Sequence, residues 1–132
     1  MTHGFDVLKT HPHPPHATLE DCIKACLDCW VACTACADAC LAEKDPTGMA
    51  ACIRQDIACA TVCAATAQVL IQSASLKDHA AVRAQLEACT AACAACETEC
   101  RSHAHHHRHC AHCAEACKAC REACERALKA LG

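Results

Sequence analysis

The sequence predicts an all-α protein, an antiparallel up-down-up-down four-helix bundle with a core lined by cysteine. Three observations lead to this fold class. Alanine-rich stretches favour helix by intrinsic propensity, the cysteines recur every three or four residues, and the breaks between the helical stretches are short. Because short connections between long helices favour antiparallel neighbours, the four helices are expected to run alternately up and down.

The expected helices lie between residues that break or begin helices. Pro46 follows Asp45 at a suitable first helical position, with Asp45 as the N-cap. Ser75, with Asp78 three residues later, resembles a capping box. The four helices are therefore predicted at Thr18–Glu43, Pro46–Ser73, Leu76–Ser102 and His105–Leu131.

The first 17 residues are expected to form a flexible arm that contains histidine and proline. Pro12, Pro14 and Pro15 interrupt helix propagation there. Residues 18–132 are expected to form one metal-storage domain, since 132 residues fit a single compact unit.

Composition and charge exclude several classes of protein. The chain begins MTHGFDVLKTHPHPPHA, without the apolar segment of a secretory signal, so a cytoplasmic location is expected. No run of about 20 apolar residues predicts a membrane span. The net charge of −3 and the absence of a basic stripe argue against a nucleic-acid partner.

Cysteine occupies 18 of the 132 positions, which is high enough to indicate a disulfide scaffold or a metal site. Within each predicted helix the cysteines are mostly three or four residues apart, the spacing of one helical face. They therefore take positions where an ordinary bundle carries Leu or Ile. The set is Cys22, Cys26, Cys29, Cys33, Cys36, Cys40, Cys52, Cys59, Cys63, Cys89, Cys93, Cys96, Cys100, Cys110, Cys113, Cys117, Cys120 and Cys124.

Two explanations of the cysteine pattern need no metal. Free cysteine packs as a small apolar residue, but a cysteine seam about 27 Å long on four helices is not explained by packing. Disulfides between residues four apart require a specific geometry and an oxidising compartment, and the cytoplasmic expectation argues against them.

The spacing favours monovalent copper among the metals that thiolates bind. Soft thiolates select Cu(I), zinc and iron–sulfur clusters. Structural zinc sites close at four ligands from short turns, and the cluster signature C-x₂-C-x₂-C-x₃-C-P is absent from the sequence. Continuous stripes instead suit many Cu(I) ions per chain, each held by two or three sulfurs. The alternative is zinc or cadmium sequestration in the manner of a metallothionein.

An enzyme is not expected. The sequence has no Ser-His-Asp set, phosphate loop or carboxylate pair, and no cysteine is singled out by a cationic neighbour as a reactive thiol would be.

The two ends of the predicted cysteine seam differ in chemistry. One end should be closed by aliphatic side chains: Leu19, Leu70, Val82, Leu86, Leu128 and Leu131. The other is polar and carries Glu43, Met49, His103, His106 and His107. We expect copper to enter at the polar end, with Met49, His103 and His107 as candidate ligands beside the thiols. Asp56 takes a position on the seam itself and is a further candidate ligand.

A second apolar stripe follows one residue after the cysteines on the first two helices. It comprises Ile23, Leu27, Trp30, Ala37 and Leu41, with Ile53, Ile57, Ala60, Ala64 and Ile71. This stripe predicts a face that packs against another subunit, hence a homo-oligomer. Packing between helices of the same subunit is the competing explanation for Trp30 and part of the stripe.

Repeated C-x₃-C pairs on a bundle without an export signal resemble the cytosolic branch of the bacterial copper storage proteins, over Thr18 to Leu131. The pairs include Cys22/Cys26, Cys29/Cys33, Cys89/Cys93 and Cys113/Cys117. The resemblance implies Cu(I) bound to the 18 cysteines, a homotetramer, and a role in copper supply or detoxification. A copper chaperone or copper enzyme would then be a partner. Asp56 departs from the pattern, which leaves the coordination around Cys52 and Cys59 open.

Overall fold

The computed structural model describes residues 2–73, 76 and 78–132. Four long helices form the body of the molecule: α2 (Ala17–Leu41), α3 (Ala50–Ile71), α4 (Ala80–His103) and α5 (Arg108–Leu131). A short helix α1 (Thr2–Lys9) precedes them, and a 3₁₀ turn η1 (Pro46–Met49) leads into α3.

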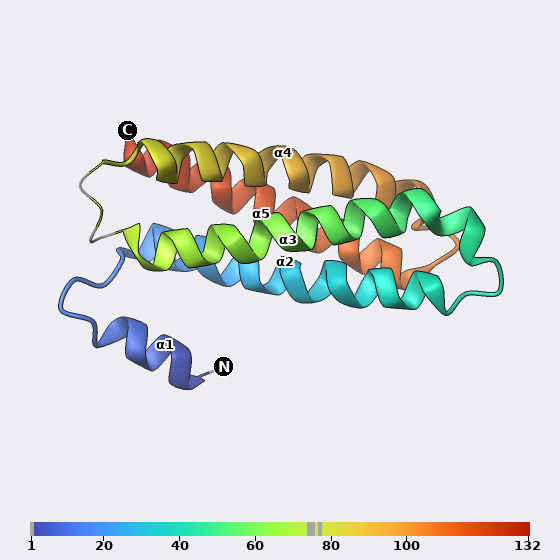
Figure 1. The fold of residues 1–132 in the computed structure, drawn as a ribbon, viewed down its shortest axis with the longest axis horizontal. Coiled ribbons are helices and arrows are strands. Elements are labelled where there is room, and N and C mark those ends of the chain that lie inside the picture. The colour runs from blue at the N-terminus through green and yellow to red at the C-terminus, as the bar shows by residue number, and fades with distance from the viewer. Residues whose placement is uncertain (1, 74–75, 77) are drawn as a thin grey trace.

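The four long helices pack as an antiparallel bundle, as predicted (Figure 1). Helix α2 lies beside α3 and α5, and α4 lies beside α5 and α3, so each helix has two neighbours around a shared centre. The α2–α3 and α4–α5 connections lie at one end of the bundle, and α3 ends and α4 begins at the other (Figure 1).

The core of the bundle consists of the inward faces of these four helices. Its buried residues are mostly cysteine, with alanines such as Ala114 and Ala127 between them. Small side chains let the helices approach closely, and the few large aliphatic residues gather at one end. A core of this composition contains little of the aromatic or branched volume that normally fills a helical bundle.

The last two of the four helices begin later than predicted. The predicted third helix begins at Ala80 rather than at Leu76, and the Asp78 side chain accepts a hydrogen bond from the Ala80 N–H at 2.9 Å. The predicted fourth helix begins at Arg108 rather than at His105, because His107 is extended. The expected capping box rests on Ser75, which lies outside the described residues.

The N-terminal arm is not irregular throughout, so that part of the prediction is wrong for Thr2–Lys9, which forms α1. The prolines at positions 12, 14 and 15 follow this helix and do not interrupt it. Phe5 and Leu8, three residues apart on one face of α1, pack against the core, and Leu8 is buried. Lys24 of α2 places its ammonium 5.4 Å from the centre of the Phe5 ring.

The second apolar stripe divides into a buried and an exposed part. Ile23 is fully buried within the subunit, in accord with the competing explanation for part of the stripe. The large apolar residues of the stripe that remain exposed are Trp30, Leu41, Ile57 and Ile71. None of the helices in the described part of the chain combines the length and the hydropathy needed to cross a lipid bilayer.

Candidate metal centre

All 18 cysteines are free thiols buried in the bundle. Each is between 0% and 2% exposed. The prediction that cysteine lines the core is therefore confirmed. Helical spacing and the packing of the helices together explain this arrangement. Residues three and four apart lie on the same face of an α-helix, and antiparallel packing turns the four faces toward one another.

The thiols contact one another both along a helix and between helices. The Cys29 sulfur lies 3.8 Å from that of Cys33 on the same helix, and 3.8 Å from that of Cys117 on α5. It also lies 4.0 Å from the sulfur of Cys59 on α3. A metal–thiolate bond is about 2.3 Å long, so sulfurs at these separations can share one ion without movement of the helices.

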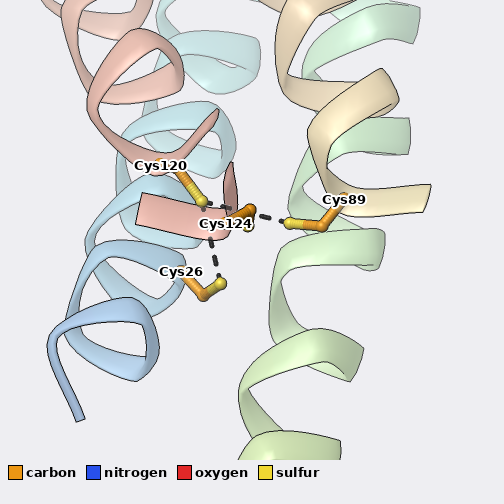
Figure 2. Close-up of side chains that lie close together, drawn as sticks. All are labelled: Cys26, Cys89, Cys120 and Cys124. Carbon is orange, nitrogen blue, oxygen red and sulfur yellow. Dashed lines mark hydrogen bonds between the residues drawn. The ribbon is translucent and has the colours of Figure 1, made fainter. Parts of the chain in front are cut away.

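One group of four sulfurs near the closed end shows the arrangement (Figure 2). Cys26 comes from α2, Cys89 from α4, and Cys120 and Cys124 from α5. The four sulfurs lie within 4.8 Å of one another. The Cys120 thiol donates to Cys26 at 3.7 Å and lies 4.0 Å from Cys89. Three helices thus converge on a single group of ligands.

Further groups of four sulfurs follow along the bundle, and the first three of them share members. Their members are Cys29, Cys59, Cys63 and Cys93; Cys29, Cys33, Cys59 and Cys117; Cys33, Cys96, Cys113 and Cys117; and Cys36, Cys40, Cys52 and Cys110. Cys29, Cys33, Cys59 and Cys117 each belong to two of these groups. The Cys63 sulfur lies 4.0 Å from that of Cys120 in the group near the closed end, and the Cys52 sulfur of the group at the polar end lies 3.7 Å from that of Cys100. The sites are therefore not separate. The core is a continuous column of sulfur in which neighbouring ions would share bridging thiolates.

Asp56 contributes a buried carboxyl group to this column. Three thiols donate to its Oδ1 atom: Cys96 at 3.2 Å, Cys113 at 3.3 Å and Cys100 at 3.4 Å. Burial is the main cause that raises the pKa of Asp56 to about 8. The structure thus places Asp56 among the thiols, at the side-chain position that the sequence predicted.

Burial also keeps thiols near the polar end protonated before metal arrives. It raises the pKa of Cys40 to about 11, with the neighbouring charge of Cys52 acting in the same direction. The pKa of Cys110 is raised for the same reasons. Metal binding at these sulfurs therefore has to displace protons.

The polar end contains a histidine that the sequence analysis did not select. His109 Nδ1 lies 3.5 Å from the Cys36 sulfur, 3.6 Å from that of Cys110 and 4.0 Å from that of Cys40. Its Nε2 lies 3.0 Å from Glu43 Oε1. His109 is thus an imidazole in contact with the sulfur column, and its place directly before Cys110 was the available signal.

The two histidines that were selected contact carboxylates instead. His103 Nε2 lies 2.9 Å from Glu99 Oε2, and His107 Nδ1 lies 3.3 Å from Glu43 Oε1. Met49 is buried against the core at the same end of the bundle. The structure therefore brings Met49, His103 and His107 to the polar end, while their role as ligands stays a prediction.

The opposite end of the column is closed by aliphatic side chains, as predicted. Leu70, Val82 and Leu86 are fully buried, Leu19 is nearly so, and Leu128 and Leu131 pack against them. The candidate methionine and histidine ligands and the charged side chains thus lie at one end of the column. The aliphatic residues named above form an apolar plug at the other.

Taken together, fold and site define the class of the protein. A helical bundle whose core is a column of free thiols is a binding protein for soft metal ions, with a capacity far above one ion.

Comparison with known families agrees with this class. The family model described as copper storage protein matches residues 15–129. The chain belongs to the copper storage protein family.

Solved structures of related proteins share the fold over nearly the whole chain. The copper storage protein Ccsp from Streptomyces lividans, loaded with 10 copper equivalents, is 46% identical, covers 94% of this chain and 96% of its own, and has a TM-score of 0.88. The cytosolic copper storage protein from Streptomyces lividans with five coppers is 50% identical, with coverage of 87% and 95% and a TM-score of 0.83. The Cu(I)-bound copper storage protein BsCsp3 is 36% identical, with coverage of 82% and 95% and a TM-score of 0.73. Comparison with curated protein sequences found no match.

Proposed function

We propose that this chain stores many Cu(I) ions along its thiol column and has no catalytic activity. One observation carries the proposal: groups of four buried sulfurs follow one another from near the plug to the polar end of the bundle, joined by shared members or by sulfur–sulfur contacts. A single regulatory or catalytic metal site needs three or four ligands. Eighteen thiols exceed that need several-fold, whereas a store needs as many as the core can hold.

The chemistry of the column suits Cu(I) as cargo. Thiolate is the softest protein ligand and favours the softest ion available to it. Two related structures from Streptomyces lividans contain copper, one with 10 equivalents and one with five coppers. All 18 cysteines are proposed as ligands, with Asp56 as an oxygen donor within the column.

Copper is proposed to enter at the polar end. The imidazoles of His103, His107 and His109 lie there, and Met49 is buried in the core at the same end. These neutral, exchangeable donors can receive the ion before thiolates deeper in the column hold it. Every ion that replaces about one thiol proton leaves the charge of the core nearly unchanged.

We further propose that the protein is cytoplasmic and assembles as a homo-oligomer, with a tetramer expected. One related protein is described as cytosolic, and reduced thiols need a reducing compartment. The exposed Trp30, Leu41, Ile57 and Ile71 form the face on which a second copy would pack. A copper chaperone or copper enzyme would deliver or receive the ion. The bundle at 18–132 would be the storage domain, and residues 1–17 an appended arm.

The proposal is tested by anaerobic titration of the fully reduced protein with Cu(I), followed by gel filtration and metal analysis of the protein peak. We expect on the order of one copper per thiol to remain bound. A Cu(I)-specific chelator in competition separates this outcome from zinc or cadmium sequestration. Saturation at one to four ions would point to discrete sites and would overturn the storage function.

A further inference from the structure

His109 lies between a carboxylate and the outermost thiols, in contact with both. Its Nε2 is 3.0 Å from Glu43 Oε1, and its Nδ1 is 3.5 Å from the sulfur of Cys36 and 3.6 Å from that of Cys110. Helix α5 contributes the histidine, while Glu43 follows the end of α2. The contact therefore joins two segments far apart in the sequence.

In a neutral histidine, the group that contacts one ring nitrogen determines whether the other nitrogen carries a hydrogen or a lone pair. A neutral imidazole has one N–H and one lone pair, and an ionised carboxylate can only accept a hydrogen bond. Glu43 therefore requires the hydrogen of neutral His109 on Nε2, and the lone pair then lies on Nδ1, facing the thiols. In the other tautomer Nδ1 would carry a hydrogen and could not bind a metal until the proton moved.

From this geometry we propose that Glu43 is a positioning residue for His109. It holds the ring in the tautomer and orientation that present the Nδ1 lone pair to Cu(I) at the polar end of the column. The proposal rests on the copper-storage function and extends it to a residue that does not touch the ion. Binding forms a dative bond from Nδ1 to copper, and the Nε2 proton stays where it is. Carboxylates commonly orient metal-binding histidines in this way.

Glu43 also reaches a second histidine at the same end. The same Oε1 atom lies 3.3 Å from Nδ1 of His107, and the rings of His107 and His109 are 5.5 Å apart, centre to centre. The Glu43 side chain is 33% exposed, so its ion pairs add little to the stability of the fold. The effect of Glu43 should accordingly appear in imidazole orientation and copper uptake rather than in folding.

A second carboxylate–histidine pair at this end supplies a matched control. Glu99 and His103 lie one turn apart on α4, with Nε2 and Oε2 separated by 2.9 Å. The two pairs have similar distances and similar exposure. They differ in that the ring of His109 also contacts thiols.

The experiment compares Glu43→Ala, Glu43→Gln and the control Glu99→Gln with the wild type. Long-range ¹H–¹⁵N NMR of reduced, metal-free protein reports the His109 tautomer. Competition with a Cu(I) chelator then reports the affinity for the first copper equivalent. We expect the Nε2–H tautomer in the wild type, a mixture in Glu43→Ala, and a loss of affinity of about tenfold or more. Glu43→Gln should partly restore both, because its amide oxygen still accepts, and Glu99→Gln should leave the His109 tautomer as in the wild type.

Two results would overturn the proposal: an Nδ1–H tautomer in the wild type, or a Glu43→Ala variant with unchanged tautomer and affinity. The copper capacity at saturation keeps this failure separate from a failure of the storage function. Capacity should stay at the wild-type value in all variants. If the wild type itself held only a few ions, the storage function would fail first.

Discussion

The Cys96 thiol donates a hydrogen bond of 3.2 Å to Oδ1 of Asp56, in a part of the core that has no contact with water. An ionised carboxylate at this depth costs free energy even with thiol donors around it. The protein offsets that cost by keeping the carboxyl group protonated, because burial raises the pKa of Asp56 to about 8.

The stability of the metal-free protein should depend on pH through Asp56. Folded Asp56 keeps its proton up to about pH 8, whereas in the unfolded chain it loses the proton near pH 4. Between these values the folded state binds more protons, so the free energy of unfolding falls as pH rises. Asp56→Asn removes this contribution.

Denaturant unfolding of reduced wild type and Asp56→Asn at several pH values checks this prediction. The stability of the wild type relative to the variant should fall by about 1.4 kcal/mol per pH unit within the window. Taking the difference cancels the titration of the histidines, which both proteins share. A difference that does not change with pH would show that the carboxyl group titrates normally.

The metal-free protein should remain folded. Protonated cysteine packs as a small apolar residue, and Leu70, Val82 and Leu86 complete the core at the closed end. Far-ultraviolet circular dichroism of reduced protein in the presence of a chelator should show a helical spectrum and a cooperative thermal transition. A largely unfolded chain, as in metal-free zinc fingers, would contradict the expectation.

Leu86→Ala should lower stability without lowering copper capacity. Leu86 is fully buried in the aliphatic plug, and truncation of such a side chain costs about 2–5 kcal/mol. Val7→Ala is the control, because Val7 is 71% exposed, lies outside the apolar stripe and should cost much less. Denaturant unfolding measures stability, and Cu(I) titration measures capacity. A capacity that fell with Leu86→Ala would mean that the plug forms part of the store.

Loss of thiols at the polar end should slow copper uptake more than loss of thiols near the plug. The double variant Cys40→Ala/Cys110→Ala removes two outer sulfurs, and Cys22→Ala/Cys26→Ala removes two near Leu19. Both should lose about two ions of capacity, if each thiol holds about one. Stopped-flow transfer from a chelated Cu(I) donor should be slower for the first variant alone. Equal rates would place the entrance elsewhere.

A charge on the exposed apolar face should dissociate the oligomer. Ile57 is 55% exposed on α3, and burying a glutamate at a subunit interface is costly. Size-exclusion chromatography with light scattering should show a smaller species for Ile57→Glu. Thr98→Glu, on the exposed surface of α4, should leave the mass unchanged. The fluorescence of Trp30, the one tryptophan in the chain, should shift to the red as it becomes exposed.

The helices and the sulfur column could be predicted because both follow from local periodicity. Cys22, Cys26, Cys29 and Cys33 must share one face of any helix that contains them, whatever that helix packs against. The failures lie where a helix begins or ends. The sequence places His107 at the polar end, where the structure has it in contact with Glu43, but it predicts that the last helix begins at His105. That helix begins only at Arg108, after the extended His107, so His109 rather than an earlier histidine reaches the thiols.

Helix α1 was missed for a related reason. The prolines after it suggested an arm without structure, while the contact of Leu8 with the core involves residues distant in the sequence. Local propensity carries no information about such contacts.

Residue spacing was sufficient to predict the bundle, its thiol core and soft-metal chemistry, because a helix places every third or fourth side chain on one face irrespective of its surroundings. Packing between helices decided which thiols from different helices meet around one ion, and it surrounded Asp56 with three donors. It also joined Glu43 to His109. Distances between atoms on separate helices depend on how those helices turn and slide against each other, and they are defined only in the folded chain.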